Sequence, residues 1–202
     1  MNIRRKVKEQ ENFYSYPHYI EKEKKEMAKK VEGLTLQDLY VDHLKDIYSA
    51  ENQITKALPK VIKTVTEPKL KKALEDHLKE TMNQIHRIEQ IFESIGGSPR
   101  GKKCVGMEGV LGEGSEAMAE EMSSPDLMDS ALIGGCKKVE HYEICAYEAV
   151  RDYAQLLGDD KAVKLLNQTI EEEKAADEKL SELGMNIIMP ETVQAAASME
   201  AM

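Results

Sequence analysis

Glutamates interrupt the apolar faces of two consecutive predicted helices in the second half of the sequence. Across residues 132–157, leucine, valine and alanine recur at three- and four-residue steps, and Glu143 falls inside that stripe. Across residues 163–183 a second stripe contains Glu173, and Asp177 follows one turn later. Burying one unpaired carboxylate costs several kcal/mol, whereas a whole domain is stable by only about 5–15 kcal/mol. Carboxylates that share a core therefore need a common cation or proton, which indicates a metal site.

The first half of the chain offers a matching pair of helices. An apolar stripe over residues 36–65 contains Glu51. The next stripe, over residues 68–95, contains His77, and Glu80 lies about a quarter-turn from its centre. For His77 we favour a core or shoulder histidine with its hydrogen bonds satisfied, and a ligand role is the alternative.

For three acidic residues, the sequence leaves two possible roles open. Glu80 and Glu140 lie away from their stripes, so each is either a metal ligand or a solvated partner of a neighbour such as Lys137. Asp177 points inward on a short side chain, so it either binds a metal ion or pairs with another charged group. His141 faces away from the core and is expected at the surface.

Local signals set the helix boundaries. Glycine and proline at 96–99 and glycine at 158 end helices, and Ser124-Pro125-Asp126 begins one. Residues 96–126, with one short helix expected near 107–111, are long enough to travel the length of a bundle. The prediction is an all-α protein: an antiparallel four-helix bundle with one long crossover between helices 2 and 3.

Charge and hydropathy divide the chain into three parts. We expect a charged N-terminal arm at 1–33, the bundle at 34–186 and a C-terminal tail at 187–202, with residues 185–190 extended. We expect the arm to be a solvated helix or a partly disordered segment. A tyrosine-containing oligomer contact and a surface that binds other components during stress are the alternatives.

Composition excludes several function classes. A net charge of -9 argues against a nucleic-acid partner. The sequence has no apolar run of about 18 residues and no signal-like start, so we expect a cytoplasmic protein with no membrane partner. Cys104, Cys136 and Cys145 form no CxxC pair, so a reducing compartment is expected, with Cys136 and Cys145 as small core residues.

Four segments resemble the YciE/YciF-like ferritin-like stress proteins. They include His77-Leu78-Lys79-Glu80-Thr81, Val139 to Ile144 (VEHYEI) and Glu172 to Leu180 (EEKAADEKL), together with Asp42-His43-Leu44 and Tyr48-Ser49-Ala50-Glu51. The likeness covers roughly residues 34–186. It implies a ferritin-like bundle, a homodimer and a link to stress responses.

The wider ferritin-like group implies a site for two iron or manganese ions. Matched by position, its carboxylates fall on Glu51, Glu80, Glu140, Glu143 and Glu173. Its histidines have no counterpart, since Asn83 and Gln84 follow Glu80, and Ala176 and Asp177 follow Glu173. An oxygen-rich site of this kind also suits hard ions such as magnesium or calcium.

Two function hypotheses follow. The first is a dimetal carboxylate protein that handles peroxide, oxygen or metal ions. The second is a metal-free helical dimer with a structural or interaction role during stress. A serine or cysteine hydrolase is disfavoured because no nucleophile-elbow motif occurs.

Overall fold

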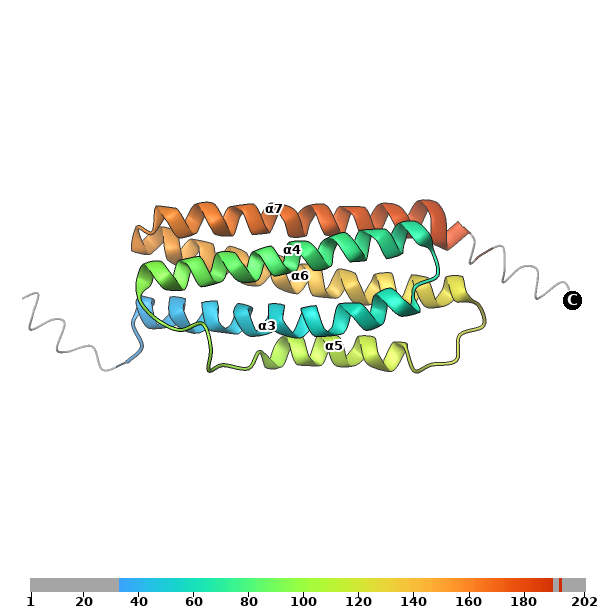
Figure 1. Cartoon of the computed structure of the whole chain (residues 1–202), viewed down its shortest axis with the longest axis horizontal. Coiled ribbons are helices and arrows are strands. Elements are labelled where there is room, and N and C mark those ends of the chain that lie inside the picture. The colour runs from blue at the N-terminus through green and yellow to red at the C-terminus, as the bar shows by residue number, and fades with distance from the viewer. Residues whose placement is uncertain (1–32, 191–192, 194–202) are drawn as a thin grey trace, which may run out of the picture. The chain divides into compact units, whose positions relative to one another are not determined.

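The computed structural model describes residues 33–190 and 193, and all of its elements are helical (Figure 1). Residues 1–32 of the expected arm at 1–33 and most of the tail at 187–202 lie outside the described residues. The elements are α3 (Leu36–Thr64), α4 (Pro68–Ile95), α5 (Val105–Ala117), α6 (Pro125–Leu157), α7 (Asp160–Leu183) and a π-helical turn, η2 (Gly184–Ile188). The predicted four-helix bundle is confirmed: α3, α4, α6 and α7 run side by side, and α5 lies in the crossover beside α3 and α6.

Capping residues explain where the helices start and stop. The side chains of Glu67, Ser124 and Asp159 each accept a hydrogen bond from a backbone N–H in the first turn of α4, α6 and α7 respectively. Gly96 and Gly158 end α4 and α6 with φ values of 74° and 75°, a left-handed conformation that glycine adopts without strain.

Two boundaries differ from the sequence predictions. The crossover helix α5 covers 13 residues, well beyond the expected turn near 107–111. Residues 185–190 are helical rather than extended, because η2 continues directly from α7 and buries Ile188 in the same apolar cluster as Leu183. The helical structure therefore passes the predicted end of the bundle at residue 186.

A layer of polar residues divides the core of the bundle in two. One apolar cluster includes Leu70, Leu132 and Leu183, and the other includes Leu44, Ile88 and Leu166. On each of the four long helices, at least one buried polar residue lies at or next to the boundary between the segments that supply these clusters. The layer consists of Glu51 on α3; His77, Thr81 and Gln84 on α4; Glu140 and Glu143 on α6; and Thr169 and Glu173 on α7.

Asp129 is a buried carboxylate with a structural role. It lies in the second turn of α6 and accepts hydrogen bonds from the backbone N–H of Thr66 (3.1 Å), the Thr66 hydroxyl (2.8 Å) and the backbone N–H of Glu67 (2.7 Å). These donors belong to the connection between α3 and α4. Asp129 therefore fastens the start of α6 to the turn between the first two helices.

Candidate metal centre

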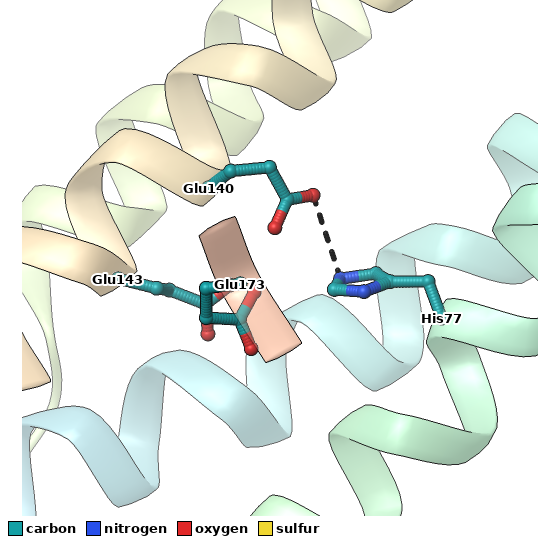
Figure 2. Close-up of side chains that lie close together, drawn as sticks. All are labelled: His77, Glu140, Glu143 and Glu173. Carbon is teal, nitrogen blue, oxygen red and sulfur yellow. Dashed lines mark ion pairs between the residues drawn. The ribbon is translucent and has the colours of Figure 1, made fainter. Parts of the chain in front are cut away.

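Four buried side chains converge within the polar layer. His77 from α4, Glu140 and Glu143 from α6, and Glu173 from α7 each offer a ligand atom, and these atoms all lie within 4.8 Å of one another (Figure 2). The Nε2 of His77 is 3.5 Å from Oε1 of Glu140. An imidazole and three carboxylates at this spacing match the donor set of iron and manganese sites.

Glu51 adds a fourth carboxylate from the remaining long helix. It is fully buried, and the hydroxyl of Tyr147 donates a short hydrogen bond to its Oε1. Burial and the neighbouring Glu173 carboxylate raise the pKa of Glu51 well above its usual range. Glu51 thus belongs to the same electrostatic cluster, although it lies outside the group of four.

The cluster contains buried polar atoms that no described residue satisfies. Oε2 of Glu51, Glu140 and Glu173, Oε1 of Glu143 and Gln84, and both nitrogens of His77 have no hydrogen-bond partner among the described residues. Buried polar groups are nearly always hydrogen-bonded, so each such atom requires an explanation. Lone pairs of carboxylates and imidazole that face a common space fit a bound cation.

Burial and mutual repulsion favour the protonated carboxyl groups when no cation is present. Desolvation, followed by the neighbouring glutamates, raises the pKa values of Glu140 and Glu143 well above the usual range. The same causes raise the pKa of the Tyr147 phenol, which therefore stays a hydrogen-bond donor to Glu51. A bound metal ion would replace these protons.

Arg87 holds α4 and α7 together beside the cluster. Its guanidinium donates two hydrogen bonds of 2.6 Å to the carboxylate of Glu172 and one of 3.0 Å to the hydroxyl of Thr169. Gln84, one turn earlier on α4, donates to Glu173. This arrangement fixes the position of Glu173 relative to His77.

Replacing Arg87 by methionine is expected to lower the free energy of unfolding by about 1–3 kcal/mol, because a bidentate, mostly buried charged pair is lost. Urea denaturation measures the change. Arg87→Lys should recover only part of it, since an ammonium group cannot form the two parallel bonds. Equal stability of Arg87→Met and the parent protein would contradict this role.

Two predicted ligands lie outside the cluster. The Glu80 side chain is 47% exposed, and its Oε2 lies 3.8 Å from Nδ1 of His77. Asp177 pairs with Lys137 at 2.6 Å and with His141 at 3.2 Å. The inward positions of α4 are occupied by His77, Thr81 and Gln84, which turns Glu80 toward the groove between α4 and α7.

Residues that sequence reasoning did not assign to the site are His77, Gln84 and Tyr147. His77 is buried in the core, as expected, but neither of its nitrogens makes a hydrogen bond with a described residue, and Nε2 faces Glu140 at 3.5 Å. Two features of the sequence could have assigned His77 to the site: its position on an apolar stripe, and the glutamates predicted on the facing helices.

For three other residues, the position expected from the sequence, at the surface or in the core, can be compared with the position in the structure. His141 is exposed, as predicted. Cys136 is half-buried, whereas Cys145 is exposed, so the assignment of Cys145 to the core is wrong.

Among the described residues, no helix combines the length and the apolar character needed to cross a membrane.

Comparison with known proteins identifies relatives over most of the chain. A family model described as a domain of unknown function, DUF892, matches residues 35–196. Protein YciF of Escherichia coli K12 is 44% identical over 153 residues, which cover 75% of this chain and 92% of YciF.

Solved structures agree with this relationship. The E. coli stress protein YciF matches with a TM-score of 0.73 and 43% identity, covering 76% of this chain and 97% of YciF. YcfI of Rhodopseudomonas palustris, described as a structural protein, matches with a TM-score of 0.71 and 40% identity, covering 75% of this chain and 96% of YcfI. The chain therefore belongs to the DUF892 family, among the YciF-like stress proteins that its helix motifs resemble.

Proposed function

We propose that this protein is a dimetal carboxylate protein that binds iron or manganese in the polar layer of its bundle. The observation that carries the proposal is the convergence of His77 on α4 with buried glutamates from α6 and α7, several of whose oxygens lack hydrogen-bond partners among the described residues. We place the function in peroxide, oxygen or metal handling during stress, because the solved E. coli relative is described as a stress protein.

Charge balance supports two divalent ions. Glu51, Glu140, Glu143 and Glu173 are all buried, and their four ionised carboxylates would match the charge of two such ions. Without cations, this negative charge would be confined to a space of low dielectric constant, at high cost.

The geometry suggests how the ligands divide between two ions. His77 and Glu140 lie 3.5 Å apart within the group of four, and Glu51 is outside that group. Glu143 and Glu173 are common to both sides, since they belong to the group with His77 and Glu140 and both also interact with Glu51. These residues would hold two redox-active ions, which when bound would supply the electrons for reduction of an oxidant.

The protein itself contributes positioning and exclusion of water. Gln84 orients Glu173, and Tyr147 orients Glu51 through hydrogen bonds. The apolar clusters on both sides of the layer keep bulk water from reaching the carboxylates along the length of the bundle core.

Metal analysis of freshly purified protein tests the proposal. We expect about two ions per chain after expression with abundant iron and manganese, and loss of both in the double variant Glu143→Gln/Glu173→Gln. The control Glu75→Gln/Glu178→Gln removes the same charge from exposed positions on α4 and α7 and should keep the metal. Parent protein without a bound transition metal would overturn the proposal.

A second function is favoured by one comparison, since the relative from R. palustris is described as a structural protein. In that case the acids of the layer would stay protonated and added metal ions would leave the melting temperature unchanged. The homodimer and the cytoplasmic location stay predictions, and sedimentation analysis of the purified protein tests the first.

A further inference from the structure

A cavity of about 60 Å³ lies between α3, α5 and α6 and ends at the candidate metal centre. We call it the α5 pocket. Its walls are mostly apolar and include Leu58 on α3, Leu111 on α5, and Leu132 and Val139 on α6. Because α5 forms one wall, the pocket is a product of the crossover rather than of the four long helices alone.

The two ends of the α5 pocket differ in chemistry. At the inner end lie His77 and Glu140, which are 5% and 2% exposed and carry atoms without hydrogen-bond partners among the described residues. At the rim lies the exposed Ser115, whose hydroxyl donates to the carbonyl of Leu111. Between these two ends, the wall of the pocket is almost entirely apolar.

A second hollow reaches the same two residues from the opposite side. It measures about 900 Å³, lies between α4 and α7, and is lined by charged groups that include Lys72, Glu80 and Glu172. Hydrated ions and strongly hydrogen-bonding molecules fit such a polar groove. In the α5 pocket they would lose hydrogen bonds to water without replacement, which disfavours their entry.

We propose that the α5 pocket binds a small non-polar molecule, and that dioxygen is the molecule it delivers to the His77–Glu140 side of the centre. Apolar cavities in proteins stay dry and bind gases such as xenon, and one water-sized site needs only about 10–15 Å³. A cavity of about 60 Å³ therefore holds a diatomic gas. The choice of dioxygen rests on the proposed function, because an oxidant is what a redox-active metal pair would use.

Two adjacent glycines on α6 provide a matched pair of variants. Gly135 lines the pocket and Gly134 does not, and a Cβ atom added at either position meets no atom within 4 Å. Gly135→Leu should therefore fill the pocket without displacing the backbone, whereas Gly134→Leu places the same side chain at an exposed position. Both changes remove a glycine from a helix interior, so their effects on helix stability should be similar.

Gas binding to the metal-free full-length protein tests the proposal. Under xenon pressure, crystals of the parent protein and of Gly134→Leu should show xenon in the α5 pocket, and crystals of Gly135→Leu should not. Dissolved dioxygen should broaden the methyl resonances of Leu132 and Val139 in the first two proteins and lose this effect in Gly135→Leu.

An α5 pocket without xenon in the parent protein, or equal broadening by dioxygen in Gly134→Leu and Gly135→Leu, would overturn the proposal. These measurements need no bound metal, so a negative result would count against the gas-binding proposal without bearing on the metal analysis described above. If the pocket binds xenon but the purified protein contains no metal, both the delivery of dioxygen to a metal centre and the proposed function are overturned.

Discussion

Replacing Asp129 by alanine is expected to lower the free energy of unfolding by about 2–4 kcal/mol, the largest effect of any single substitution that we predict. The change removes a fully buried carboxylate and leaves two backbone N–H groups and one hydroxyl, from Thr66 and Glu67, without their acceptor. Hydrogen bonds to a charged acceptor contribute more than neutral ones. The midpoint of urea denaturation measures the loss, provided that the slope of the transition is unchanged.

Asp126 provides the control for this prediction. It lies in the first turn of the same helix, three residues before Asp129, and is not buried. Asp126→Ala should therefore cost only the helix-dipole contribution of about 0.3–1 kcal/mol. Similar losses in the two variants would show that Asp129 does not fasten α6 to the α3–α4 connection.

Metal ions are expected to stabilise the parent protein and to have no effect on Glu143→Gln/Glu173→Gln. A ligand at a hundred times its dissociation constant adds about 2.7 kcal/mol, which corresponds to an increase in melting temperature of roughly 5–10 °C for a chain of this size. In the absence of metal, the variant should melt above the parent protein, because two amides replace two buried carboxyl groups of the crowded layer. Differential scanning calorimetry with and without manganese measures both effects.

The metal-free parent protein should lose stability as the pH rises. The pKa values of Glu51, Glu140 and Glu143 are raised in the folded state, so the fold holds protons that the unfolded chain releases above pH 4.5 or so. The free energy of unfolding therefore falls as the pH increases from there toward neutrality. The stabilisation by metal should grow over the same range, since fewer protons compete for the ligands.

Comparison of variants isolates this pH dependence. Surface carboxylates such as Asp76 have lowered pKa values and shift stability in the opposite direction, but they are identical in the parent protein and in Glu143→Gln/Glu173→Gln. The decline with pH should be shallower in this double variant and unchanged in Glu75→Gln/Glu178→Gln. Parallel pH profiles for all three metal-free proteins would contradict the buried-carboxylate interpretation.

Local chemistry made most helix boundaries predictable. The Ser124-Pro125 start of α6 and the glycine ends of α4 and α6 depend on capping and on backbone conformation within a few residues. The extent of α5 and the helical residues after Gly184 were not predicted. Burial of Met107 and Ile188 accompanies these segments, and such burial depends on contacts with distant helices.

The sequence by itself determined that Glu51, Glu143 and Glu173 face the inside of a helical bundle, because helical periodicity assigns each residue to one side of its own helix. Only the tertiary structure decided which atoms meet. The relative height of the four helices brings His77 and Glu140 into the layer, while the angular position of Glu80 on α4 and the pairing of Asp177 with Lys137 keep those two carboxylates outside it. Height between helices is set by packing of the two apolar clusters, to which residues far apart in the sequence contribute, and periodicity within one helix carries no information about it.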